Sequence, residues 1–254
     1  MSVVNTSQHF AKNSYHGRLQ IRLSLRGRFV HLLIPAAGVG RRMGSDRNKL
    51  LMPLLEKPIL SWTLQAAAAT KSLQWIGIIC QPIDRPDIEK IVKQCGLTIP
   101  LAFIQGGNTR QASVYKGLQS LPQEATHVLI HDGARCLATA DLFDRCAEAA
   151  LKTKGFIAAV PVKDTIKQVG SNGVITNTPD RANLWAAQTP QGFEVALLKQ
   201  CHDRGQAEGW EVTDDAALLE KCGVPVSIVE GEETNLKVTT PVDLAIAQFI
   251  LQQR

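Results

Sequence analysis

Four basic side chains gather on one short, glycine-rich stretch of the sequence. The segment AAGVGRRMGSDRNK, residues 36–49, contains three arginines and Lys49, and it follows an apolar run, residues 30–35. Glycine lets successive backbone N–H groups turn toward one bound anion. Arginine adds bidentate contacts to phosphate, and lysine adds a compact point charge. The segment therefore predicts a polyphosphate site after a strand; the simpler alternative is a solvated basic loop.

Two familiar phosphate-binding loops do not fit this segment. The dinucleotide-binding motif GxGxxG would need glycine at position 43, which is Met43, and the GK[ST] end of a P-loop is absent. A dinucleotide-dependent dehydrogenase is therefore disfavoured, and a different anion-binding loop is expected.

The segment HVLIHDGAR, residues 127–135, is a second candidate for chemistry. Its apolar part has the pattern of a buried strand, which would deliver Asp132 and Arg135 to the strand's carboxyl end. A carboxylate there could hold Mg²⁺ beside a triphosphate, because Mg²⁺ prefers one or two carboxylates together with phosphate oxygens. Equally, Asp132 could cap a turn or pair with Arg135.

The segment QGGNTRQASV, residues 105–114, is a third candidate. A Gly-Gly turn leads into a helical pattern, and Asn108, Thr109 and Ser113 carry groups that can bond a base or a ribose. The alternative is an ordinary loop that ends in a helix cap.

The elements that must position these residues have the pattern of an α/β protein. Apolar runs that read as buried strands alternate with segments of helical periodicity, which predicts a Rossmann-like, mostly parallel sheet with helices on both faces. Ligands of such sheets bind beyond the carboxyl ends of the strands. The expected strands are residues 30–35, 75–80, 101–105, 127–131, 156–162 and 226–231. Two later helices have readable starts: Thr213 can cap one, with Asp214 and Asp215 in its first turn, and Thr240 can cap the last, with Pro241 at its first position.

Residues 163–185 interrupt this alternation. Two extended, polar pieces flank GSNG, a sequence typical of a hairpin turn, and no helix follows them. A two-stranded ribbon is marginally stable alone, so we expect a projecting hairpin that docks on something else.

Bulk composition narrows the function classes. The chain has 254 residues, 44% of them hydrophobic, and a net charge of +5, which suits a globular protein with an anionic ligand. No basic tract points to nucleic acid, and no apolar run approaches the roughly 18 residues that a membrane span needs. The six cysteines show no CxxC pair or metal-ligand spacing, so free, buried thiols in a reducing compartment are expected.

Residues 1–29 differ from the rest of the chain. They contain five basic residues and no acidic one, and they lack an apolar signal core. We treat them as an extension outside the 30–254 domain: a poorly ordered tail, a start assigned too early, or an organelle transit peptide. We expect a cytoplasmic protein, or a plastid-type location if the extension is a transit peptide.

A series of motifs occurs in a fixed order along the chain: PAAGVGRRMG with NKLL, GGNTRQASV, HDGAR, PVKDTIK, PDRANLW, TPQGF, VTDDAALLE and NLKVTTPVDL. This series resembles the 2-C-methyl-D-erythritol 4-phosphate cytidylyltransferase family of the sugar-nucleotidyltransferase superfamily. The motifs span about residues 30–254. The chain departs from the usual family pattern at Asn108, where an acid is common, and in HDGARC and NKLL, which replace HDAARP and PKQY.

The resemblance implies CMP transfer from CTP to methylerythritol phosphate in isoprenoid precursor biosynthesis, with Mg²⁺ as cofactor. It also implies a homodimer in which the arm, about residues 163–185, reaches the partner's active site. The implied catalytic residues are Arg42, Lys49 and Lys237. The implied nucleotide-binding residues are Ala36, Ala37, Gly38, Gly40, Arg41, Gly107, Asn108, Ser113 and Asp132. The implied substrate-binding residues are Arg135, Thr165, Arg181 and Thr189, and Asp132 is the candidate metal ligand.

Such a reaction needs positioned cations rather than an activated nucleophile, because the attacking phosphate oxygen is already ionised. The sequence offers no Ser-His-Asp or Cys-His set. Two other functions stay open: a ribitol-5-phosphate cytidylyltransferase, which shares much of the series, and a nucleotide-binding module without catalysis. The joint presence of Arg42, Lys49, Asp132 and Lys237 disfavours the module, which could dispense with several of them.

Overall fold

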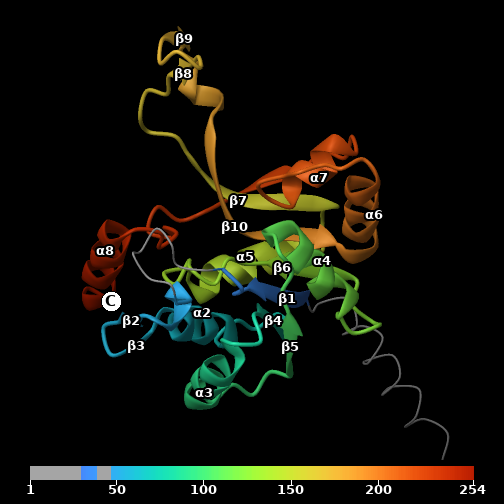
Figure 1. Ribbon diagram of the computed structural model, residues 1–254, viewed down its shortest axis with the longest axis vertical. Coiled ribbons are helices and arrows are strands. Elements are labelled where there is room, and N and C mark those ends of the chain that lie inside the picture. Colours follow the sequence, from blue (N-terminus) through green and yellow to red (C-terminus); the bar gives the residue numbers. More distant parts are fainter. Residues whose placement is uncertain (1–29, 39–46) are drawn as a thin grey trace, which may run out of the picture.

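The computed structural model describes residues 30–38 and 47–254, and within them a mixed α/β sheet forms the centre of the molecule (Figure 1). Seven strands pair in the order β11-β7-β10-β6-β1-β4-β5. All neighbouring pairs are parallel except those of β10, which runs antiparallel to both β6 and β7. The strands are β1 (Val30–Pro35), β4 (Leu73–Cys80), β5 (Leu101–Gln105), β6 (His127–Ile130), β7 (Gly155–Pro161), β10 (Trp185–Glu194) and β11 (Ser227–Glu230).

Helices cover both faces of this sheet. Side chains of successive β1 residues alternate between two hydrophobic clusters, with Leu32 and Ile34 in one and Leu33 in the other. The first cluster lies under α2 (Ile59–Ala68), α3 (Arg85–Cys95), α5 (Ala140–Ala150) and α8 (Pro241–Gln252). The second lies under α4 (Arg110–Gln119), α6 (Val195–Ala207) and α7 (Ala216–Lys221). Strands buried on both faces are therefore continuous apolar runs, as the sequence predicted.

The strand order reverses beside β1. The chain passes from β1 to β4 and β5 on one side, and then returns to β6 on the other side. The carboxyl ends of the parallel strands β1, β4, β5 and β6 therefore lie at one edge of the sheet, which is where ligands of such folds bind. Described residues of all three candidate segments, among them Lys49, Gly107 and Asp132, line one cavity at this edge.

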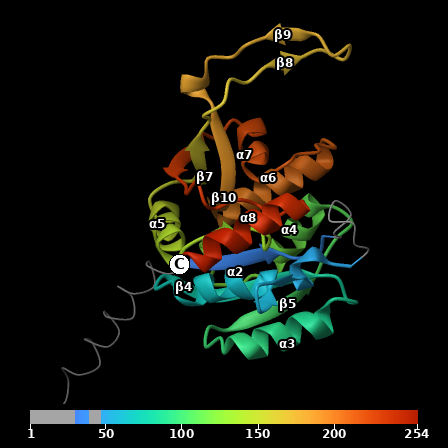
Figure 2. The ribbon, with the colours of Figure 1, turned by 90° about the vertical axis from the view of Figure 1, so that its left-hand side faces the viewer.

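The predicted hairpin forms an arm that projects from the body of the molecule (Figures 1 and 2). Strands β8 (Gln168–Val169) and β9 (Ile175–Asn177) pair antiparallel, and the short helix η3 (Arg181–Asn183) follows on the return to β10. The description of the ribbon as polar was incomplete. Val174 and Ile175 near its tip are 59% and 57% exposed.

Two local predictions had opposite outcomes. Thr240 caps α8 as expected, in a capping box with Asp243 and with Pro241 at the first helical position. Thr213, expected to cap the preceding helix, does not, because α7 begins only at Ala216 and Asp215 occupies the cap position.

Candidate nucleotide site

A cavity of about 540 Å³ lies at the carboxyl ends of β1, β4, β5 and β6. Most of the described residues that the sequence assigned to the nucleotide contribute to its wall. The lining residues include Ala37, Gly38, Lys49, Gly107, Asn108, Ser113, Asp132 and Lys237. They come from four separate loops, and the sheet brings them together.

Asp132 is the charged centre of this wall. Its Oδ2 accepts from Lys237 Nζ at 2.6 Å, and its Oδ1 lies 3.4 Å from Arg110 Nε. Burial alone would raise the pKa of Asp132, but the charges of Arg110, Lys237 and Arg135 outweigh it and hold that pKa well below the usual range. The carboxylate is therefore ionised at neutral pH, and it fixes two cations beside the cavity.

Arg110 belongs to a second buried ion pair behind this wall. Its NH1 lies 2.8 Å from Oδ2 of Asp215, which is only 1% exposed, and Asp215 Oδ1 lies 3.4 Å from His202 Nε2. Burial lowers the pKa of Arg110, but the two aspartates raise it further, so the guanidinium stays charged. Sequence reasoning missed Arg110 because its partners are distant in the chain; its only visible signal was a cation at the start of α4.

The turn after β6 holds Asp132 and Arg135 in place. His131 contacts Thr189 Oγ1 through Nδ1 at 3.1 Å and the Arg135 carbonyl through Nε2 at 3.2 Å. Full burial lowers the pKa of His131 to about 4, so its ring is neutral. The Arg135 guanidinium donates to the carbonyl of Asn235 at 2.7 Å.

The start of α4 is built for a close approach by a ligand. Thr109 caps the helix by accepting from Ala112 N at 3.0 Å, and Ser113 Oγ accepts from Gly107 N at 3.0 Å. A Cβ on Gly107 would lie 2.7 Å from the Ala112 side chain, so only glycine fits there. The alternative of a capped loop is thus correct for the local structure, and this loop also lines the cavity.

Asn48 anchors the turn that carries Lys49. Its amide donates to the Ala36 carbonyl at 2.7 Å and to Asp84 Oδ2 at 2.9 Å, and its Oδ1 accepts from Leu50 N at 3.1 Å. This buried asparagine begins the short helix η2 (Lys49–Leu51) and was not singled out from the sequence. Its bonds tie η2 to the end of β1.

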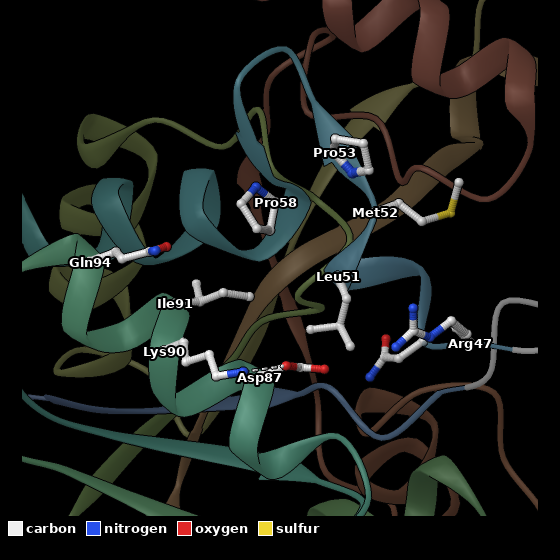
Figure 3. Close-up of a pocket in the computed structure, with 10 residues that line it drawn as sticks. Arg47, Leu51, Met52, Pro53, Pro58, Asp87, Lys90, Ile91 and Gln94 are labelled. Atoms are coloured by element: carbon white, nitrogen blue, oxygen red, sulfur yellow. Dashed lines mark hydrogen bonds and ion pairs between the residues drawn. The ribbon is translucent and has the colours of Figure 1, made fainter.

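A second cavity, of about 490 Å³, lies on the other side of this turn (Figure 3). Asn48 lines the second cavity and Lys49 lines the first, so the turn forms the wall between them. Figure 3 shows Arg47 and Leu51 on one side and Asp87 and Lys90 of α3 on the other. The antiparallel pair β2 (Pro53–Leu54) and β3 (Lys57–Pro58) closes its end.

The remaining predicted site residues lie elsewhere. Gly40, Arg41 and Arg42 lie outside the described residues. Ala36 is buried, and its carbonyl accepts a hydrogen bond from the Asn48 amide.

The two predicted residues of the arm, Thr165 and Arg181, are exposed and do not line this cavity. Arg181 NH1 donates instead to the Lys163 carbonyl at 2.8 Å, across the base of the arm. Thr189 and Arg135 lie behind the cavity wall rather than on it.

The described residues offer no metal cage, and their cysteines form no disulfide. No group of three or more His, Cys, Asp or Glu side chains in this part of the chain could hold a metal ion. Asp132 is the only carboxylate among the described residues that line the cavity. All six cysteines are free, as expected, but only four are buried, because Cys95 and Cys222 are partly exposed. Burial raises the pKa of the Cys136 thiol to about 12. No helix among the described residues is long and apolar enough to cross a membrane.

Comparison with protein families and sequences gives one consistent result. The family model of 2-C-methyl-D-erythritol 4-phosphate cytidylyltransferase matches residues 30–253. The protein of that name from Crocosphaera subtropica is 68% identical over 225 residues, which are 89% of this chain and 99% of that protein. The protein of the same name from Synechocystis is 66% identical, over 89% of this chain and 98% of its own length.

Solved structures agree with the sequence comparison. The 4-diphosphocytidyl-2C-methyl-D-erythritol synthase of Anaerococcus prevotii matches with a TM-score of 0.80 and 30% identity, over 89% of this chain and 99% of that one. The 2-C-methyl-D-erythritol 4-phosphate cytidylyltransferase of Thermus thermophilus matches with a TM-score of 0.73 and 32% identity, over 88% and 99%.

Proposed function

The chain belongs to the 2-C-methyl-D-erythritol 4-phosphate cytidylyltransferase family, and we propose that it transfers CMP from CTP to 2-C-methyl-D-erythritol 4-phosphate. The products are 4-diphosphocytidyl-2-C-methyl-D-erythritol and pyrophosphate. The match over residues 30–253 confirms the resemblance found in the motif series. The relatives carry the methylerythritol name, which favours this acceptor over ribitol phosphate.

One observation supports nucleotidyl transfer at this site more than any other. Among the described residues, Lys49, Arg110 and Lys237 line one cavity with a single carboxylate, Asp132, which pairs with Arg110 and Lys237. A site with excess positive charge suits two reacting anions, because their mutual repulsion is the main obstacle to reaction. A nucleotide-binding module has no need for so much fixed charge.

The reaction follows from these charges. A phosphate oxygen of the acceptor forms a bond to the α-phosphorus of CTP, and the bond from that phosphorus to the bridging oxygen breaks. The bond electrons leave with pyrophosphate. We assign Lys49, with Arg42, to the charge that develops on the phosphorus oxygens, and Lys237 to the orientation of the acceptor phosphate.

Mg²⁺ fits this site as a partner of the nucleotide rather than as a resident ion. Asp132 is the only carboxylate among the described cavity-lining residues, so the phosphates of CTP would have to supply most of the ligands. Lys237 already holds Asp132 Oδ2 at 2.6 Å, whereas the contact of Oδ1 with Arg110 is longer, at 3.4 Å. Asp132 Oδ1 is therefore the candidate ligand atom. The bound ion would neutralise phosphate charge.

We further propose a homodimer in which the arm serves the partner's site. Thr165 and Arg181 lie on the arm and do not line this subunit's cavity, although they match substrate-binding positions of the family motifs. The exposed apolar side chains near the arm's tip suit burial against a second copy. Residues 1–29 lie outside the family match, and a cytoplasmic location, or a plastid-type one if they act as a transit peptide, belongs to the proposal.

The decisive assay is pyrophosphate release from CTP and Mg²⁺, with methylerythritol phosphate and ribitol phosphate as parallel acceptors and ATP and GTP as parallel donors. We expect turnover only when methylerythritol phosphate is the acceptor and CTP is the donor. Lys49→Ala should lower kcat at least ~10²-fold, the scale for losing one preorganised charge. The exposed, distant Lys152→Ala is the matched control. Equal release with ribitol phosphate, or none with either acceptor, contradicts the proposal.

A further inference from the structure

Asn48 is a buried residue whose side chain bonds to three separate parts of the chain. Its Nδ2 lies 2.7 Å from the Ala36 carbonyl, just beyond β1, and 2.9 Å from Oδ2 of Asp84, which precedes α3. Its Oδ1 lies 3.1 Å from Leu50 N in η2. The next residue, Lys49, lines the cavity of about 540 Å³. The strand end, the start of α3 and the helix that carries Lys49 therefore meet at one amide.

These partners leave the Asn48 amide only one orientation. The Ala36 carbonyl and the Asp84 carboxylate both accept, so they face the NH₂ group and use its two protons. The Leu50 N–H only donates, so it faces the amide oxygen. Asn48 is 3% exposed and is not among the described residues that line the 540 Å³ cavity. A direct contact between Asn48 and a substrate phosphate is therefore disfavoured by the geometry.

The position of Lys49 depends on these bonds because η2 is very short. The helix has three residues, and Leu51 N closes its turn by donating to the Asn48 carbonyl at 3.1 Å. A 3₁₀ turn of this length is marginal alone, since its few bonds do not offset the cost of ordering the backbone. The residues on either side of Lys49 are Asn48 and Leu50, which are 3% and 4% exposed and bonded to each other. The Asn48 side chain thus fixes the backbone on which Lys49 stands.

We propose that Asn48 is a positioning residue that sets Lys49 for the chemical step, and that Asp84 assists by holding the Asn48 amide. The proposal rests on the proposed function. A preorganised charge stabilises a transition state only at the right distance and angle, and an error of about 1 Å can cost ~10²-fold in rate.

Substrate binding should be less sensitive to such an error than the chemical step. The cavity wall also carries Arg110 and Lys237, so the attraction for two anions does not depend on the exact place of Lys49. The proposal therefore predicts a loss of kcat with little change in KM.

Variants at both ends of the link between Asn48 and Asp84 test this proposal. Asn48→Ala removes all three side-chain bonds. Asn48→Asp keeps the shape and the acceptor for Leu50 N, but it turns a carboxylate oxygen toward the Ala36 carbonyl and the Asp84 carboxylate. Adding Asp84→Asn to Asn48→Asp returns a donor to this pair. Asp84→Ala removes one of the three bonds and leaves residue 48 unchanged.

Thr70→Val is the matched control. Thr70 is 5% exposed, its hydroxyl donates to the Ala66 carbonyl at 3.1 Å, and it does not line the cavity. This variant should lower the melting temperature and leave kcat and KM unchanged. All assays are run well below the melting temperature of each variant, so that unfolding does not reduce the measured rate.

We expect Asn48→Ala to lower kcat on the order of 10-fold while KM for CTP and for the acceptor stays within about 3-fold. Asp84→Ala should lower kcat about 3-fold, because two of the three bonds remain. Asn48→Asp should lose more than Asn48→Ala, since it opposes two carboxylates. The double variant Asn48→Asp/Asp84→Asn should regain at least ~3-fold in kcat over Asn48→Asp.

The same bonds can be observed without turnover. In the ¹⁵N-labelled parent protein, with the signals assigned by means of Asn48→Asp, the side-chain amide protons of Asn48 should exchange with solvent far more slowly than those of the exposed Asn172. Asp84→Ala should make this exchange faster.

Three results would overturn the proposal. The first is an unchanged kcat for Asn48→Ala, whether or not KM rises. The second is a double variant that is no more active than Asn48→Asp. The third is an Asn48 amide in the parent protein that exchanges as fast as that of Asn172. This last measurement needs no activity, so it judges the hydrogen bonds even if the parent protein releases no pyrophosphate and the proposed function fails.

Discussion

The two halves of β10 show how differently one strand can be stabilised. Its first residues, starting at Trp185, are exposed, pair with β7 alone and carry the arm. Its later residues are buried between β6 and β7, and Gln188 and Thr189 bond to the segment around Asn235. The buried half satisfies its polar groups within the chain. The exposed half leaves apolar surface open among the described residues, with Trp185 40% exposed.

The difference teaches which parts of the site one subunit completes alone. Asp132, Lys237 and Lys49 are held by bonds within the chain. The arm residues Thr165 and Arg181 lie on a ribbon whose neighbours are mostly its own strands. The predictions below test this division, from the largest expected effect to the smallest.

Subunit exchange gives the sharpest test of the division. Arg181→Ala and Lys237→Ala should each lower kcat at least ~10²-fold, because each removes a charge contact to phosphate. Mixed after exchange, they form heterodimers in which one site has both residues intact if Arg181 serves the partner. Random pairing makes about half of the dimers mixed, so up to roughly a quarter of all sites recover. If exchange is verified by mass and activity does not recover, Arg181 acts within its own subunit.

Stability should respond strongly in the body and weakly in the arm. Asp215→Ala leaves Arg110 without its buried partner and should lower the free energy of unfolding by about 3 kcal/mol. Asp180→Ala removes an exposed carboxylate that caps η3 by accepting from Ala182 N at 3.0 Å, and it should cost under about 1 kcal/mol. Urea unfolding measures both. Equal losses would show that the arm packs as firmly as the body.

The contribution of Asp215 to stability should depend on pH in one direction. Burial raises its pKa, but Arg110 and His202 outweigh burial and leave it below the ordinary value. A lowered pKa in the folded state stabilises the protein above the unfolded-state pKa of about 4 and loses that effect as pH falls through the folded value. The gap between the parent and Asp215→Asn should therefore be constant from pH 7 to 5 and shrink below about pH 4. A constant gap down to about pH 2 contradicts this.

The smallest effect on stability is expected at the arm's tip. Val174→Ser and Ile175→Ser change side chains that are more than half exposed, so the melting temperature of a single subunit should move by no more than a degree or two. The proposed dimer should nevertheless become weaker, so its dissociation constant should rise, which analytical ultracentrifugation detects. The exposed Val242→Ser on α8, 67% exposed in the parent, is the matched control. An unchanged dimer would remove the tip from the interface.

Much of this architecture could be predicted because its signals are local. Buried parallel strands are short apolar runs, so each expected strand matches one of the observed strands within two residues at either end. The turn after β6 and the glycine pair before α4 are marked by glycine residues at the end of an apolar run, and the hairpin turn GSNG is typical of its class. The roles of Asp132 and Lys237 were predicted from the order of the motifs rather than from hydrophobic periodicity.

The rest depends on contacts between distant residues, which no local pattern carries. Strand β10 was not assigned from the sequence, because Pro190 and Gly192 interrupt its apolar pattern, whereas burial between β6 and β7 decides its conformation. The role of Asn48 follows from a carbonyl twelve residues earlier. Thr213 was wrong as a cap because α7 starts where Asp215 meets Arg110, not where the propensity is highest.

The order of synthesis gives these long separations a further consequence. Arg110 pairs with Asp215, which is synthesised 105 residues later, and Arg135 donates to the carbonyl of Asn235, which is synthesised 100 residues later. Domains form from the N-terminus as the chain emerges, and distant contacts close last because loop closure costs entropy. The early strands can therefore pair while Asp132 still lacks Lys237. The nucleotide site is completed only when nearly the whole chain has been made, so a truncated product would present a sheet without a working charge cluster.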